Sequence, residues 1–232
     1  MTEHRSSRRE FVTRTGKFAS ALSLTAVAAP QIAAATEKYS SFPEVSGEWD
    51  LSWLTLLAKA TDRAVFDWPG LGDPADPLVL ELAERYLDNC EAAYAPGKYE
   101  ARVVLNIRTQ AVAAALNDAM WDRYALGTEY KATDPVSHNP AVRNPFWHRA
   151  PDPAPGITLP SLADMVQRGA IILVCDFALG HLSKRLAENL KRDTTDVHSD
   201  LRKGFVPGAF AVPSGIFGLA KAQNAGCAFI RM

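Results

Sequence analysis

Short apolar runs alternate with helical patterns along residues 63–232, and this alternation limits the fold more than any other feature of the sequence. The runs are rich in β-branched and aromatic residues, which favour strands. Chains that alternate strand and helix form parallel sheets with helices on both faces, because a helix crosses over between successive strands. The sequence therefore predicts a three-layer α/β/α fold around a five-stranded, mainly parallel sheet. The predicted strands are residues 63–68, 101–107, 170–174, 208–212 and 227–230.

Two helical patterns lie between the first three strands. The first begins at Asp76 and Pro77, an N-cap followed by a first-turn proline. Its apolar stripe at steps of four residues is predicted to face the core, so Cys90 is expected to pack rather than react. The stripe consists of Leu78, Leu82, Tyr86, Cys90 and Tyr94, and it is flanked by Val79, Ala83 and Leu87. The second pattern predicts one helix that ends near Gly127 and has Val112, Leu116, Met120 and Tyr124 on its core face.

The first 35 residues match a twin-arginine export signal. Residues 7–12 read Ser-Arg-Arg-Glu-Phe-Val, and the alanines at residues 33–35 form a small-x-small cleavage site. The apolar run between them, residues 18–29, has roughly half of the ~20 residues needed to cross a bilayer. We therefore expect cleavage after Ala35, no permanent membrane anchor, and a mature protein in the periplasm or exported. The twin-arginine translocase is the partner that this signal implies.

Loss of residues 1–35 makes the chain acidic. That segment has five Lys or Arg and two acidic residues, which leaves 20 basic and 24 acidic residues, a net charge of −4. Nucleic-acid binding needs a basic face against the phosphates, so we predict no nucleic-acid partner. The mature part holds three cysteines and no CxxC pair, which excludes a thioredoxin motif and a zinc ribbon.

The rest of the chain divides into an arm and a domain. Residues 36–62 are predicted to form an N-terminal arm, and residues 63–232 one domain. Residues 128–160 interrupt this domain with seven of the fifteen prolines. Loops of this length are typical of lids, partner-binding arms or disorder, and the aromatic cluster around Phe146 and Trp147 argues against disorder. The insertion is predicted to be a lid or subunit-contact arm, or alternatively a structural wrap.

The candidate site is centred on Cys175, where the third predicted strand ends and a helix begins. Ligands of open α/β sheets bind at the carboxyl ends of the strands. Helix amides that point at the sulfur would also favour the reactive thiolate. Arg108 ends the neighbouring strand and is the expected cation beside that thiolate. The side chains and amides predicted to complete an anion-binding pocket with Arg108 are those of Asp67, Trp68, Ser214 and Gly215.

Two stretches of sequence resemble the DsrE/DsrF-like family of sulfur-relay proteins. The first is Ile-Leu-Val-Cys-Asp-Phe-Ala-Leu at residues 172–179, and the second runs from Val-Pro-Ser-Gly at residues 212–215 to the strand ending at Ile230. The resemblance covers roughly residues 64–230. It implies a five-stranded parallel sheet, assembly into trimers or hexamers, and a persulfide carried on Cys175. The export signal, the Pro-rich insertion and Asp176 depart from the family pattern.

Asp176 admits two interpretations, which the sequence leaves open. A carboxylate next to Cys175 would raise the pKa of the thiol, or it could cap the helix that follows. Cys227 is predicted at the start of the last strand, on the opposite edge of the sheet from Cys175. A disulfide between the two is therefore expected to be out of reach.

Three functions are compatible with these residues. The first is an oligomeric module that binds a small ligand around Cys175 without catalysis, and the second is a persulfide-carrying or thiol-redox protein that uses Cys175. The third, a metal or haem protein, has little support, because the candidate histidines have no close ligand spacing and no CxxCH occurs. No cofactor or metal is therefore predicted, and the question of enzyme activity stays open. The histidines considered are His138, His148, His181 and His198.

Overall fold

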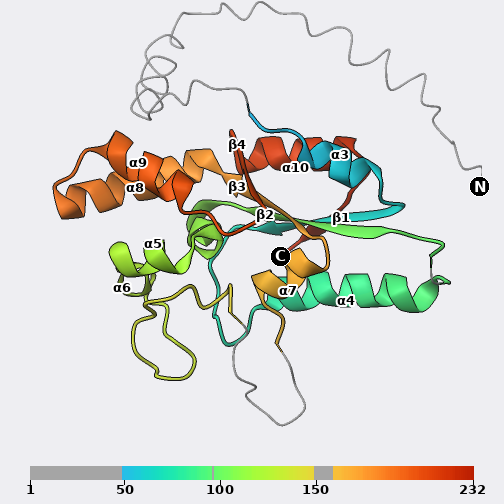
Figure 1. Cartoon of the computed structure of the whole chain (residues 1–232), viewed down its shortest axis with the longest axis horizontal. Coiled ribbons are helices and arrows are strands. Elements are labelled where there is room, and N and C mark those ends of the chain that lie inside the picture. The colour runs from blue at the N-terminus through green and yellow to red at the C-terminus, as the bar shows by residue number, and fades with distance from the viewer. Residues whose placement is uncertain (1–48, 96, 149–158) are drawn as a thin grey trace, which may run out of the picture. The chain divides into compact units, whose positions relative to one another are not determined.

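A sheet of five parallel strands lies at the centre of the molecule, in the order β4-β3-β2-β1-β5 (Figure 1). The computed structural model describes residues 49–95, 97–148 and 159–232. The predicted export signal, its cleavage site and the first part of the arm lie outside the described residues. The sheet and its covering helices confirm the predicted three-layer α/β/α fold. The strands are β1 (Asp62–Trp68), β2 (Ala101–Ile107), β3 (Ile171–Cys175), β4 (Ala209–Val212) and β5 (Ala228–Arg231).

Helices cover both faces of the sheet because successive residues of each strand point to opposite sides. Val103 and Leu105 of β2 pack with α4 (Leu78–Ala93) and α7 (Leu162–Gln167) on one face. Val104 packs with α3 (Trp53–Ala58) and α10 (Gly215–Asn224) on the other (Figure 1). All five residues of β3 are buried, as expected of a central parallel strand.

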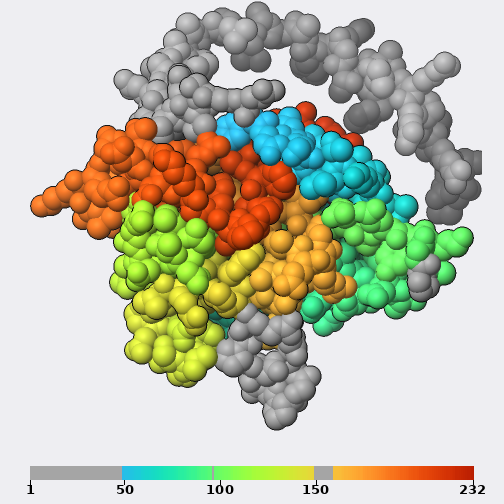
Figure 2. All heavy atoms as spheres, viewed as in Figure 1, coloured from blue at the N-terminus to red at the C-terminus, as the bar shows by residue number. Residues whose placement is uncertain are grey.

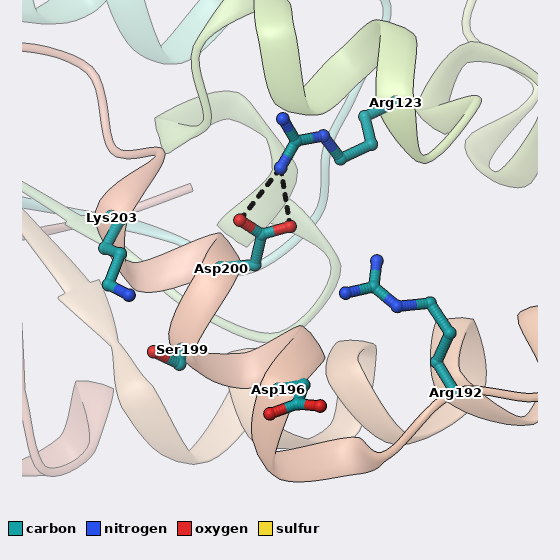
Figure 3. Close-up of a pocket in the computed structure, with 6 residues that line it drawn as sticks. All are labelled: Arg123, Arg192, Asp196, Ser199, Asp200 and Lys203. Carbon is teal, nitrogen blue, oxygen red and sulfur yellow. Dashed lines mark hydrogen bonds and ion pairs between the residues drawn. The ribbon is translucent and has the colours of Figure 1, made fainter.

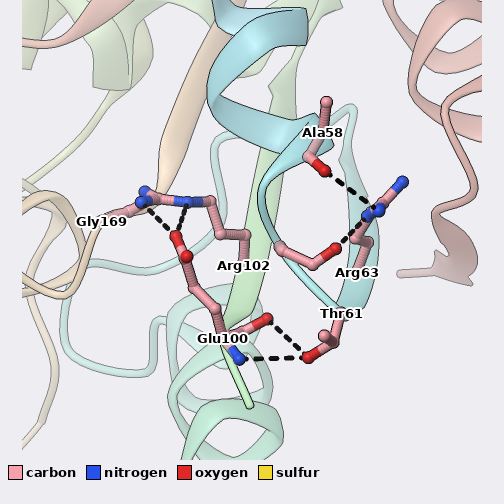
Figure 4. A network of polar contacts seen from close by, with 7 residues as sticks. Ala58, Thr61, Arg63, Glu100, Arg102 and Gly169 are labelled. Atoms are coloured by element: carbon pink, nitrogen blue, oxygen red, sulfur yellow. Dashed lines mark hydrogen bonds and ion pairs between the residues drawn. The ribbon is translucent and has the colours of Figure 1, made fainter. Parts of the chain in front are cut away.

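Arginines fix the amino-terminal edge of the sheet (Figure 4). Arg63 donates from Nε to the carbonyl of Ala60 at 2.7 Å and from Nη1 to the carbonyl of Ala225. Arg102 binds Glu100 from Nε and Nη2 and donates from Nη1 to the carbonyl of Gly169 at 2.8 Å. These bonds hold the turns that lead into the strands at the edge opposite the candidate site.

The helix predicted over Val112 to Tyr124 is wrong. The chain forms a 3₁₀ helix, η2 (Thr109–Ala115), and then α5 (Asp118–Arg123) and α6 (Leu126–Tyr130), so Gly127 lies inside a helix. The break occurs at Leu116, which is extended and bridges to Phe205. Asn117 then caps α5 by accepting from the amide of Met120. A tertiary contact has therefore overridden a continuous helical pattern.

The buried face of α4 includes the predicted flanking residues Val79, Ala83 and Leu87, but not the two ends of the predicted stripe. Leu78 and Tyr94, at the ends of the predicted stripe, are 53% and 45% exposed. Cys90 is buried, as predicted. The buried residues of α4 are Val79, Leu80, Ala83, Leu87 and Cys90.

The described part of the Pro-rich insertion packs on the domain. Asn144 is fully buried and donates from Nδ2 to the carbonyls of Ala114 and Leu116 at 2.7 and 2.6 Å. Phe146 packs edge-on against Trp68 with ring centroids 5.7 Å apart. Residues 149–158 of the insertion lie outside the described residues. Buried polar and aromatic contacts therefore hold this part of the chain on the domain.

Two long helices follow β3 and extend past the carboxyl ends of the strands. They are α8 (Asp176–Leu190) and α9 (Thr194–Lys203). In the space-filling view their surface adjoins that of α5 and α6 (Figure 2), and ion pairs join Arg123 to Asp200 and Glu129 to Arg185. No helix in the described ranges has the length and apolar character needed to cross a membrane.

Candidate functional site

The candidate site lies at the carboxyl ends of β3 and β4. The helices that follow these strands, α8 and α10, pack on opposite faces of the sheet. Leu179 and Leu182 of α8 share a core cluster with α4, whereas Ala222 of α10 shares one with α3. Crevices at such points, beyond the carboxyl ends of the strands, bind ligands in open α/β sheets. A cavity of about 430 Å³ occupies this position. It is lined by Arg108, Thr109, Gln110, Tyr130, Cys175, Phe177, Ala178, His181, Arg185, Ser214, Gly215 and Ile216.

Cys175 forms part of the wall of this cavity and also caps α8. Its Sγ accepts a hydrogen bond from the amide of Ala178 at 3.4 Å, and 5% of the residue is exposed. Burial raises the pKa of the Cys175 thiol, and the amides of Ala178, Gly215 and Phe177 oppose this effect. The amides that the sequence predicts are therefore present, but burial outweighs them and favours the neutral thiol.

Arg108 is held rigidly beside the cavity by Asp67. The guanidinium donates from Nε to Oδ1 and from Nη2 to Oδ2 of Asp67, both at 2.7 Å, which is a bidentate pair. Asn106 donates from Nδ2 to the same Oδ1 at 3.2 Å. These bonds raise the pKa of Arg108, so the cation is permanent. The third guanidinium nitrogen of Arg108, Nη1, takes no part in this bidentate contact.

Asp67 and Trp68, which the sequence analysis expects in the pocket, are not among the residues that line this cavity. Asp67 lies behind Arg108 and acts through it. Trp68 is 3% exposed and packs on Phe146 in the core. Neighbouring residues of a strand point to opposite faces, so these two side chains could not both have faced one ligand.

Ser214 and Gly215 line the cavity from the start of α10, and Gly215 lies against the stem of Arg108. Ser214 caps α10 by accepting from the amide of Phe217 at 3.2 Å. A Cβ atom at Gly215 would lie 2.7 Å from Cβ and 2.9 Å from Cδ of Arg108. Glycine is therefore the residue that allows the arginine stem to lie against the first turn of α10.

Asp176 faces away from Cys175 and towards α9. Its Oδ1 lies 3.2 Å from Nε2 of His198 and 3.5 Å from Nη1 of Arg202. The carboxylate is buried, and its charge contributes to the raised pKa of Cys175. Cys175 itself is the cap of α8, so the prediction that Asp176 caps this helix is wrong, whereas its predicted electrostatic effect on the thiol has the expected direction.

A second arginine, Arg185, lines the cavity and was not among the residues predicted for the site. Arg185 binds Oε1 of Glu129 at 3.1 Å and the hydroxyl of Tyr130 at 3.4 Å, and its guanidinium carbon lies 5.8 Å from the Tyr130 ring centroid. Helical periodicity counted from Cys175 would have found this wall, because Ala178, His181 and Arg185 follow at steps of three or four residues. Tyr130 could not be found in this way, since it comes from α6.

The described residues include no group of three or more His, Cys, Asp and Glu side chains that could hold a metal ion. All three cysteines described, Cys90, Cys175 and Cys227, are free thiols.

A second hollow, of about 380 Å³, lies between α5 and α9 (Figure 3). There Asp200 accepts two bonds from Nη1 of Arg123 and one from the hydroxyl of Tyr124. These bonds hold the pKa of Asp200 below its usual value. Three cations and two carboxylates line this hollow, and Arg123 and Asp200 among them form an ion pair with each other.

Comparison with known proteins adds one distant structural match. No protein-family model matches the chain, and no curated protein matches it. Among solved structures, the chain is similar to MTH1491, a protein of unknown function from Methanobacterium thermoautotrophicum, with 13% sequence identity and a TM-score of 0.36. The match covers 74% of this chain and 99% of that chain.

Proposed function

We propose that this chain is a DsrE/DsrF-like protein that binds a small anionic ligand in the cavity at the carboxyl ends of β2, β3 and β4. One observation carries the proposal: Arg108, Arg185 and the amino ends of α8 and α10 surround a single cavity. Helix amino ends attract anions, and a guanidinium supplies charged donors in a fixed geometry. Asp67 supports this role because it fixes Arg108 before any ligand arrives.

Calorimetric titration with thiosulfate, sulfite and acetate tests the proposal. We expect Arg108→Gln to weaken binding about tenfold or more, since a charge-assisted hydrogen bond contributes ~1.5–3 kcal/mol. Arg102→Gln is the matched control, because Arg102 lies at the other end of the same strand and binds Glu100 in a similar way (Figure 4). The proposal fails if none of these anions binds, or if both variants bind like the wild type.

A second candidate function is sulfur transfer through Cys175. It is favoured by the position of the sulfur in the cavity wall, with backbone amides directed at it. In this reaction the Cys175 thiolate attacks the terminal sulfur of a persulfide R–S–SH. The S–S bond breaks, Cys175 becomes Cys–S–SH, and R–S⁻ leaves. No oxidant or reductant is consumed.

Mass spectrometry after incubation with a small-molecule persulfide distinguishes this candidate from simple binding. Transfer adds one sulfur atom to Cys175 and none to Cys175→Ser. Labelling of Cys90 and Cys227 is the internal control, since both are buried away from the cavity. If anions bind but Cys175 gains no sulfur, the protein is a binding module without this chemistry.

Export and assembly belong to the same proposal. The arginine pair of residues 8 and 9 supports export through the twin-arginine translocase, to the periplasm or beyond. The family resemblance supports assembly into a trimer or hexamer. Light scattering of the purified chain tests the assembly, and a monomer at all concentrations would contradict it.

A further inference from the structure

We infer that the ligand is an extended amphipathic organic anion, whose acidic group lies beside Arg108 and whose apolar body lies along the first turns of α8 and α10. This inference rests on the proposed function and names the chemical class of its ligand. It follows from three features of the cavity wall: its charges, its exposed apolar side chains, and the spacing along α8 of the residues that form it.

The charges of the wall favour one acidic group. Among the described residues that line the cavity, none is Asp or Glu, whereas Arg108 and Arg185 are both cations. Each arginine is already paired outside the wall, Arg108 with Asp67 and Arg185 with Glu129. Such pairs leave hydrogen-bond donors but little net charge. The cavity therefore suits a carboxylate or another monoanion better than a polyphosphate.

Apolar side chains form a large part of the wall. Ile216, at the first turn of α10, is 76% exposed, and Phe177, at the first turn of α8, is 39% exposed. Ala178 and the Tyr130 ring extend the same wall. Exposed apolar side chains that gather around a cavity mark a binding surface, and polar groups within such pockets set the orientation of the ligand. An inorganic anion would leave these side chains in water.

The residues that line the cavity from α8 lie at separate places along that helix. Cys175 and Arg185 stand ten residues apart, and ten residues of α-helix rise about 15 Å. Arg108 and the amide of Gly215 lie at the Cys175 end, where α8 and α10 both begin. The acidic group is assigned to this end because the helix amides add to the guanidinium only there.

Titration with straight-chain carboxylates from acetate to octanoate tests the inference. We expect affinity to rise about fourfold for each added CH₂, the ratio that corresponds to ~0.8 kcal/mol for a buried methylene. Ile216→Ser and Phe177→Ser should reduce this dependence on chain length, so that octanoate loses more affinity than acetate. Leu190→Ser is the control, because Leu190 is an equally large and exposed residue of α8 that does not line the cavity.

The possible failures are separable. If thiosulfate, sulfite and acetate bind but octanoate binds no more tightly than acetate, the inference is overturned and the proposed function stands. If no anion binds, the proposed function fails and the inference fails with it. If Ile216→Ser changes the oligomeric mass while the dependence on chain length stays the same, the apolar rim is a contact between copies, which also overturns the inference.

Discussion

Asp67 and Arg108 meet at the carboxyl ends of adjacent strands through two parallel hydrogen bonds of 2.7 Å. The carboxylate is buried, and 29% of the arginine side chain is exposed towards the cavity. The buried carboxylate of Asp67 thus orients the partly exposed guanidinium of Arg108. The pairing of β1 with β2 therefore determines where the cation of the candidate site lies.

Removal of this carboxylate should destabilise the fold. We expect Asp67→Ala to lower the free energy of unfolding by about 1–3 kcal/mol, because it leaves Arg108 and the buried Asn106 without their shared acceptor. Glu100→Ala removes a 45% exposed acid from a similar pair and should cost at most about 1 kcal/mol. Denaturant unfolding measures both values. Equal decreases in the free energy of unfolding would show that burial of Asp67 does not make its ion pair more stabilising than the exposed one.

Gly215→Ala should disturb the site through Arg108. The new Cβ would lie within 3.0 Å of two carbons of the arginine stem, so the side chain must move. Overpacking of this kind costs about 1–3 kcal/mol. We expect a loss of anion affinity together with a lower melting temperature. Gly70→Ala is the control, since nothing lies within 4 Å of a Cβ there; unchanged binding in Gly215→Ala would contradict the assigned role of Arg108.

Alkylation of Cys175 should be slow at neutral pH and should accelerate in the alkaline range. Burial raises the pKa of Cys175, so the reactive thiolate appears only at a pH above that of an ordinary cysteine. Burial also raises the pKa of Cys227, to about 11, and no amide bond opposes the effect there. Iodoacetamide labelling resolved by residue should therefore modify Cys175 at a lower pH than Cys227. Rapid labelling of Cys175 at pH 7 would show that the thiol is activated.

Asp176→Asn should make Cys175 more reactive. The charge of Asp176 contributes to the raised pKa of the thiol, so its neutralisation lowers that pKa and increases the thiolate fraction at a given pH. Asn keeps the shape of the side chain beside His198. Labelling of the buried Cys90 serves as the control for unfolding. An unchanged rate at Cys175, with Cys90 still protected, would rule out this electrostatic influence.

Substitution of the arginine pair should block export. Replacement of both Arg8 and Arg9 by lysine keeps the charge but removes the residues that define the signal. The precursor should then accumulate in the cytoplasm with its first 35 residues attached. Cell fractionation and N-terminal sequencing measure this, and a correctly cleaved periplasmic product from the double variant would point to another export route.

The elements that sequence predicted well are those whose local pattern and tertiary environment agree. β2 has the predicted bounds, because a run of branched apolar residues also lies in the middle of the sheet. The helix expected over Val112 to Tyr124 failed because Leu116 is needed as a bridge partner for Phe205. Such a contact joins residues far apart in the chain, and no local periodicity encodes it.

The candidate site was predictable on the strands and less so on the helices. Cys175, Arg108, Ser214 and Gly215 follow strands, and parallel strands bring their carboxyl ends together, so these four line one cavity. Trp68 lies in the core rather than at the cavity, because neighbouring residues of a strand point to opposite faces of the sheet. Tyr130 is supplied by α6, whose position depends on how the chain between β2 and β3 folds back, and no pattern near Cys175 indicates it.

The hydrogen bond from the Ala178 amide to the Cys175 sulfur links the floor of the cavity to the start of α8. A substituent on the Cys175 sulfur would either keep this hydrogen bond or break it. A chemical change at the sulfur therefore acts on the first turn of α8, the helix that also brings His181 and Arg185 to the cavity. One sulfur atom therefore serves both as part of the cavity wall and as the cap of the helix that forms the far wall.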